Sequence, residues 1–170
     1  MQLELRLRTP RSIHTAFTRS VSMMGATLVM GDGHVGVGEQ VIVNLGVNAR
    51  DAMPNGGRLT IDADMVAIDE DEATARDISA GHYVLISVTD TGTGIDEAIQ
   101  GSIYQPFFST KGVGKGTGLG LSMVYGFFKQ SGGHIEFETD QGSGTTFKLY
   151  LPASEQRPVR SAARKSNQQF

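Results

Sequence analysis

The stretch GVGKGTGLGLSMVYGFFKQSGG, residues 112–133, decides the fold, because a run rich in glycine leads directly into an apolar segment. Residues 118–131 are mostly apolar and long enough for a buried helix. Glycine lets backbone N–H groups come close to an anion, and the start of a helix adds a favourable dipole. The stretch therefore predicts phosphate binding at the beginning of a helix, although a flexible loop without a ligand would have the same composition.

Two common nucleotide-binding motifs do not fit these glycines. A Walker A loop requires Ser or Thr directly after Gly-Lys, but Gly116 follows Lys115. A dinucleotide fingerprint requires GxGxxG immediately after a strand, and this stretch has neither feature. If the run binds phosphate, it belongs to another kind of site.

A carboxylate stands at the end of the most clearly predicted strand, residues 83–90. Strand alternation places Asp90 on the same face as the valines and the isoleucine of that strand. A carboxylate that faces an apolar layer needs a hydrogen-bond donor, and the exocyclic amine of adenine would supply one. The glycines of the following Thr91-Gly92-Thr93-Gly94 also allow a simpler interpretation, an Asx-type turn before a helix cap.

A polar stripe runs along the predicted helix of residues 39–53. Asn44, Asn48 and Asp51 are spaced i, i+4, i+7, beside an apolar stripe that begins at Val41. Two amides and a carboxylate next to a core suit a hard cation and phosphate oxygens. A solvated helix face would have the same pattern.

A threonine opens the last predicted strand, residues 144–151. Thr145 is in register with the apolar residues of that strand, so its hydroxyl faces inward. An inward hydroxyl can bridge a ligand to Asp90, or it can bond a backbone carbonyl.

Strands and helices mix without regular alternation, so the sequence predicts an α+β fold, a two-layer sandwich with a mixed, mostly antiparallel sheet on one layer of helices. We expect residues 1–38 to form irregular strands and a glycine-rich loop, 39–152 the core, and 153–170 a disordered basic tail or linker. The remaining expectations are strands near 3–8, 26–30, 58–66 and 133–139, a loop at 31–38, an acidic loop at 69–81 with a helical turn, and a glycine-rich segment at 101–117.

Composition excludes several classes of protein. The 170 residues, 39% hydrophobic and 19% charged, suit one globular domain. A net charge of −3 argues against nucleic-acid binding by the chain as a whole. The absence of Cys excludes thiolate metal sites and thiol catalysis, and the four scattered histidines do not suggest a metal centre.

Four motifs in a fixed order resemble the ATP-binding catalytic domain of sensor histidine kinases, a member of the superfamily of gyrase, Hsp90 and mismatch-repair ATPases. EQVIVNLGVNARDAMPNGG resembles the N box, DTGTGID the G1 box, YQPFFSTK the F box and GKGTGLGLSMVYGFFKQSGG the G2 box. GSGTTFKLYLP matches the closing segment, and the resemblance covers roughly residues 39–152.

The resemblance implies a role for each matching residue. Asp90 would bond the adenine amine, supported by Thr145, while Asn48 would ligate Mg²⁺ with Asn44 near the phosphates and the metal. Lys111 and Lys115 would offset phosphate charge from the ATP lid, which Phe107 and Phe108 would anchor by packing unless they are simple core residues. The other residues expected to contact the nucleotide are Asp51, Gly92, Gly94, Ile95, Gly116, Thr117, Gly118, Leu119, Gly120 and Leu121.

Position 44 bears on mechanism. Hydrolytic members of the superfamily carry a Glu there as a general base, whereas Asn44 is not a base at neutral pH. The resemblance therefore implies a site that holds Mg-ATP for phosphoryl transfer to a histidine. The alternatives are a non-catalytic regulatory module of the same fold and a hydrolytic ATPase.

The family's acceptor histidine lies in a separate dimerisation domain. Leu7-Arg8-Thr9-Pro10 matches only the end of its signature, and Leu5 and Arg6 occupy the positions of the His and the acidic residue. We therefore expect the chain to be part of a longer kinase, or to act on an acceptor elsewhere, and not to autophosphorylate alone. The implied partners are a histidine-bearing dimerisation domain and a response regulator, with the domain monomeric in isolation, cytoplasmic and without direct membrane contact.

Overall fold

The computed structural model describes residues 2–7, 21–22, 25–26, 35–112 and 116–153. It contains a five-stranded sheet in the order β1-β4-β5-β7-β6, in which β1 pairs with β4 in parallel and the other neighbours are antiparallel. The helices are α2 (Val35–Ala52), α3 (Glu70–Arg76), α4 (Glu97–Gln100) and α5 (Gly120–Gln130). The strands of the sheet are β1 (Gln2–Leu7), β4 (Arg58–Ile68), β5 (Gly81–Asp90), β6 (His134–Asp140) and β7 (Gly144–Pro152), and β2 (Val21–Ser22) pairs separately with β3 (Gly25–Ala26).

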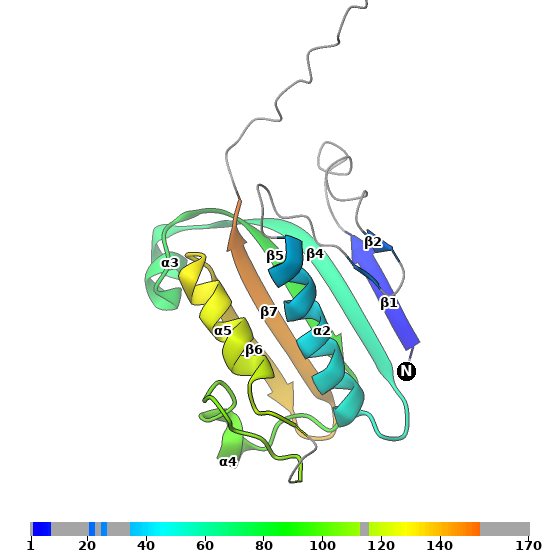
Figure 1. Cartoon of the computed structure of the whole chain (residues 1–170). Coiled ribbons are helices and arrows are strands. Elements are labelled where there is room, and N and C mark those ends of the chain that lie inside the picture. The colour runs from blue at the N-terminus through cyan, green and yellow to red at the C-terminus, as the bar shows by residue number, and fades with distance from the viewer. Residues whose placement is uncertain (1, 8–20, 23–24, 27–34, 113–115, 154–170) are drawn as a thin grey trace, which may run out of the picture.

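The main core lies between the sheet and two helices. Figure 1 shows α2 and α5 side by side over one face of the sheet. Phe128 and Val124 of α5 are each 1% exposed, Leu45 of α2 is 2% exposed, and Leu149 at the centre of β7 is 0% exposed. Each such side chain contributes roughly 1.5–3 kcal/mol on burial. The predicted α+β two-layer sandwich is confirmed.

A short helix covers part of the opposite face of the sheet. Ala73 of α3 packs with Ile68, Tyr83 and Tyr150, whose side chains lie on the face away from α2 and α5. The helix begins at Asp69, whose carboxylate accepts a hydrogen bond from the backbone N–H of Glu72. The segment expected to be an acidic loop with a helical turn is therefore a capped helix, stabilised by this second apolar cluster.

The start of α2 differs from the sequence prediction. The helix begins at Val35, four residues before the expected residue 39, so Gly36 and Gly38 are helical and not part of a loop. Each interior glycine costs about 1 kcal/mol relative to alanine, but extending an existing helix adds a hydrogen bond per residue, so the earlier start is tolerated. Of the strand expected at 26–30, the structure describes Ala26 alone, as the last residue of β3. Residues 27–34 and the expected tail from 154 to 170 lie outside the described residues.

Candidate functional site

Asp90 is a buried carboxylate at the end of β5. It is 6% exposed, and its Cα partner across the sheet, Thr145 of β7, is 4% exposed, so both side chains face inward as predicted. The Asp90 Oδ1 atom accepts a hydrogen bond from the backbone N–H of Gly92 over 2.8 Å. Burial raises the pKa of Asp90, and it outweighs the opposing effect of the backbone N–H groups of Gly92 and Thr145. A carboxyl group in this position favours a partner that donates a hydrogen bond.

The loop after Asp90 threads between two other elements. A Cβ atom on Gly92 would lie 2.7 Å from the carbonyl oxygen of Ala52, at the end of α2. A Cβ atom on Gly94, where φ is 74°, would lie 2.5 Å from the carbonyl oxygen of Asp140, at the end of β6. The backbone N–H of Thr93 also donates to the Ala52 carbonyl over 3.0 Å. Both glycines are thus required by the protein's own packing.

Thr139 supports this corner, and the sequence analysis did not identify it. Its Oγ1 atom lies 3.0 Å from Oγ1 of Thr145, donates to the carbonyl of Gly144 over 3.2 Å and accepts from the backbone N–H of Ile95 over 2.9 Å. The register of the β6–β7 hairpin pairs Thr139 with Thr145, and this pairing could have identified Thr139 from the sequence.

The polar stripe of α2 meets the segment that precedes α5. Nζ of Lys111 donates to Oδ1 of Asn48 over 3.3 Å and lies 2.5 Å from Oδ2 of Asp51. One turn back, Nδ2 of Asn44 donates to the carbonyl of Gly120 over 3.3 Å. The hydrogen bond from Lys111, and a smaller effect of Arg50, hold the pKa of Asp51 below its usual value. The structure therefore brings together residues 63 positions apart that the sequence analysis assigned to one site.

Phe107 and Gly118, which both have left-handed backbone conformations, are joined by a hydrogen bond across the residues between them. Phe107 has a φ of 66° and Gly118 a φ of 65°, and the backbone N–H of Phe107 donates to the Gly118 carbonyl over 2.9 Å. Phe108 packs against the core, as predicted. Phe107 does not, because the left-handed backbone turns its side chain outward and leaves it 78% exposed. The prediction that both phenylalanines pack is wrong for Phe107.

The other expected site residues lie around the start of α5. Leu119 is the residue that precedes the helix, and Leu121 packs against the main core. Gly116 and Thr117 are exposed, Gly120 contacts Asn44, and Lys115 lies outside the described residues. Whether these residues contact phosphate stays a prediction.

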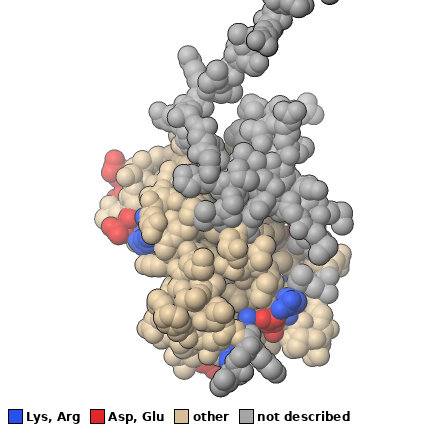
Figure 2. Space-filling model, in the orientation of Figure 1, with Lys and Arg blue, Asp and Glu red and all other residues tan. Residues whose placement is uncertain are grey.

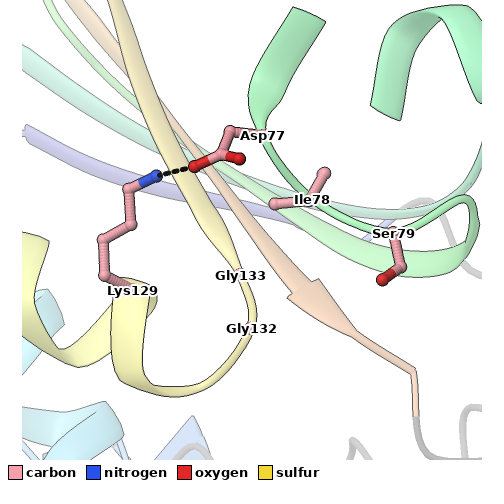
Figure 3. A pocket seen from close by; sticks show the side chains of 6 residues that line it. All are labelled: Asp77, Ile78, Ser79, Lys129, Gly132 and Gly133. Atoms are coloured by element: carbon pink, nitrogen blue, oxygen red, sulfur yellow. Dashed lines mark ion pairs between the residues drawn. The ribbon is translucent and has the colours of Figure 1, made fainter. Parts of the chain in front are cut away.

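A separate hollow lies away from this site. Figure 3 shows a pocket of about 420 Å³ near the end of α5, where Nζ of Lys129 lies 3.5 Å from a carboxylate oxygen of Asp77. None of the expected site residues lines it. In the described part of the chain, no group of three or more His, Asp or Glu residues is arranged to hold a metal ion. Within the same ranges, no helix has the length and apolar character needed to cross a bilayer.

Comparison with known proteins agrees with this geometry. Residues 36–155 match the family described as "Histidine kinase-, DNA gyrase B-, and HSP90-like ATPase". The chain is 55% identical to the sensor kinase CckA of Brucella abortus (strain 2308) over 115 residues, which are 67% of this chain and 12% of that protein. It is 34% identical to sporulation kinase A of Bacillus subtilis (strain 168) over 146 residues, 86% of this chain and 21% of that protein. The chain thus corresponds to only a small part of the length of these relatives.

Solved structures show the same fold. The nucleotide-free catalytic domain of histidine kinase ThkA superposes with a TM-score of 0.56 at 26% identity, covering 88% of this chain and 80% of that one. Full-length ShkA in complex with AMPPNP gives a TM-score of 0.57 at 24% identity, covering 94% of this chain and 28% of that one. The chain belongs to the histidine kinase-, DNA gyrase B- and HSP90-like ATPase family, as a catalytic ATP-binding domain of the sensor histidine kinase type.

Proposed function

We propose that the chain binds Mg-ATP and positions its γ-phosphate for transfer to a histidine on a separate dimerisation domain. The observation that carries this proposal is the carboxylate of Asp90, buried to 6% exposure beside Thr145 at an end of the sheet where two further elements converge. The backbone N–H groups of Gly92 and Thr145 do not outweigh the cost of burying this carboxylate, so its retention here favours a ligand with a further donor. The adenine amine has that chemistry.

The residues of α2 suit the metal of such a complex. Mg²⁺ prefers oxygen ligands and usually takes one or two from the protein, with phosphates and water completing its shell. Asn48 would supply the first oxygen and Asn44 the second, one helical turn apart. When bound, the ion would neutralise the charge that develops on the phosphates during transfer.

Each remaining part of the site has a role in this proposal. Asp90 and Thr145 orient the base, while Lys111 and Lys115 offset phosphate charge. Backbone N–H groups at the start of α5 face the phosphates, which a helix N-terminus favours. The residues assigned to this lining are Gly92, Gly94, Ile95, Phe108, Gly116, Thr117, Gly118, Leu119, Gly120 and Leu121.

Transfer is favoured over hydrolysis because position 44, where hydrolytic members of the superfamily carry a general-base Glu, is an asparagine. The side chain of Asn44 is an amide, and it already accepts a hydrogen bond from Gln40 and donates one to Gly120. An amide in such a network does not take a proton from water at neutral pH. A response regulator would then receive the phosphoryl group from the histidine, and the domain would act in the cytoplasm, where ATP is present.

The experiment supplies the missing acceptor. The chain is incubated with Mg-ATP labelled at the γ-phosphate, alone and with the histidine-bearing dimerisation domain of a relative. The proposal expects label on the acceptor, on nitrogen and therefore acid-labile, and none on the chain alone. Nucleotide binding without transfer to any acceptor would favour a regulatory module, and steady release of phosphate would favour a hydrolytic ATPase.

A further inference from the structure

Lys111, in the segment before α5, contacts the polar stripe of α2 at the candidate site. Its ammonium group contacts α2 twice, at Asn48 Oδ1 over 3.3 Å and at Asp51 Oδ2 over 2.5 Å. Its backbone N–H donates to Oγ of Ser109 over 3.2 Å, which fixes the turn from which the side chain extends. A positive group therefore occupies the Asn48 amide oxygen, at which Mg²⁺ would bind.

Asp51 holds this lysine in place. Its second oxygen, Oδ1, accepts from Nε and Nη2 of Arg50 over 3.0 and 2.9 Å, so both carboxylate oxygens face cations. The Lys111 and Asp51 side chains are each 30% exposed, so water and salt weaken this ion pair without abolishing it. Figure 2 shows adjoining red and blue atoms near the carboxyl end of α2, on a face otherwise mostly uncharged where described.

The same lysine cannot serve Asp51 and a phosphate fully at once. Its ammonium group has three N–H donors, but its single positive charge cannot fully balance both the Asp51 carboxylate and a phosphate that enters. A carboxylate also repels a triphosphate, and its own Coulomb interaction with the nucleotide is unfavourable. Its contacts therefore fit an anchor for Lys111 better than a ligand of the nucleotide.

We propose that Asp51 is a positioning residue that holds Lys111 on Asn48 in the nucleotide-free domain and must release it when the triphosphate binds. This inference rests on the proposed function, since it assigns Lys111 to the phosphates of the same site. Asp51 thereby lowers nucleotide affinity, because its contact with Lys111 must be broken before the lysine reaches phosphate. Asp51 thus sets the affinity of the site for nucleotide through Lys111, without binding the nucleotide itself.

The test is a double-mutant cycle on the full chain, with a non-hydrolysable ATP analogue and Mg²⁺ in a calorimeter. An exposed ion pair contributes roughly 0.2–1 kcal/mol, so Asp51→Asn is expected to tighten binding by roughly 1.4- to 5-fold. Lys111→Met is expected to weaken binding. In the Lys111→Met background, the gain from Asp51→Asn is expected to shrink to the part that comes from direct repulsion between the carboxylate and the triphosphate, because the lysine that Asp51 holds is gone.

Controls separate positioning from a general charge effect. Asp71→Asn removes one negative charge from α3, on the far face of the sheet, and should leave affinity unchanged. Asp51→Glu keeps the charge and should restore the parent's affinity and its sensitivity to Lys111→Met. Thermal unfolding of each variant checks that the domain stays folded.

Two results overturn the inference while leaving nucleotide binding intact. Weaker or unchanged binding by Asp51→Asn would show that Asp51 is not a competing anchor. An equal gain from Asp51→Asn with and without Lys111 would assign the effect to direct repulsion. A folded parent chain that binds no nucleotide would instead refute the proposed function itself, and the inference with it.

Discussion

Asp90→Asn replaces one carboxylate oxygen by an NH₂ group at the end of β5, with almost no change in volume. The amide oxygen can still accept the hydrogen bond that the backbone N–H of Gly92 gives to Oδ1 over 2.8 Å. The other atom changes from acceptor to donor and would face the amine of adenine, another donor. The substitution therefore removes one ligand contact while keeping the internal contact that shapes the loop.

The expected loss of affinity follows from the chemistry of that contact. A hydrogen bond to a charged group contributes roughly 1.5–3 kcal/mol, and 1.4 kcal/mol corresponds to a tenfold change in Kd. The Kd for an ATP analogue should rise roughly 10- to 150-fold. Isothermal titration calorimetry with Mg²⁺ measures this Kd. Asp62→Asn serves as the control: Asp62 follows Ile61 on β4, whose side chain faces the core, so the Asp62 side chain lies on the opposite face of the sheet from the site.

Stability should move the other way, which separates loss of binding from loss of fold. Burial raises the pKa of Asp90, so this group favours the folded state at pH values below the unfolded pKa, and that contribution is lost as the pH rises through the folded pKa. At pH 7 the ionised carboxylate is a cost that the neutral amide lacks. Asp90→Asn should therefore unfold at a temperature no lower than the parent. Unchanged affinity in a folded Asp90→Asn variant would refute the assignment of Asp90 to the base.

Four further predictions follow from the same geometry. Gly118→Ala should destabilise the domain, because φ is 65° at this position and the new Cβ would lie 2.4 Å from the backbone of Phe107. Gly126→Ala on α5 is the matched control: its Cβ would meet no atom within 4 Å, so it should stabilise the domain by about 1 kcal/mol. Equal melting temperatures of the two variants would contradict this prediction. Phe107→Gly should not destabilise the domain, since it relieves a left-handed backbone that costs about 1–2 kcal/mol and removes a side chain that is 78% exposed; a clear drop in denaturation midpoint would contradict this. Asn44→Glu should introduce a base and raise basal release of phosphate, and an assay that finds hydrolysis and nucleotide binding both unchanged would remove the support for this account of position 44. The pKa of Asp51 lies below its ordinary value of 3.8, so the stabilising contribution of this carboxylate is complete above pH 3.8 and is lost as the pH falls through the folded pKa. Acid unfolding of Asp51→Asn should therefore lack this loss, and identical acid profiles of parent and variant would contradict it.

The parts of the fold predicted correctly depend on local patterns. Alternation along β5 and β7 placed Asp90 and Thr145 inward, because the period of a strand fixes which face each side chain takes. The apolar character and the length of residues 118–131 predicted α5, which the structure places at Gly120–Gln130. These features need no knowledge of distant contacts.

The parts that were missed depend on contacts between distant segments. Helix α3 is stabilised by Tyr83 and Tyr150, whose positions on the sheet no local pattern near residue 73 reveals. The resemblance implied that Phe107 packs, but its left-handed backbone, whose N–H donates to the carbonyl of the distant Gly118, leaves its side chain exposed. The pairing of Lys111 with Asp51 likewise required the two segments to be placed together first.

The central claim is that this domain holds a magnesium nucleotide between α2, α5 and the end of β5. Calorimetric titration of the parent chain with a non-hydrolysable ATP analogue, with and without Mg²⁺, tests it most directly. The account predicts saturable binding to one site that is clearly tighter when Mg²⁺ is present. Absence of binding by a chain that unfolds cooperatively, or binding that Mg²⁺ does not affect, would contradict it.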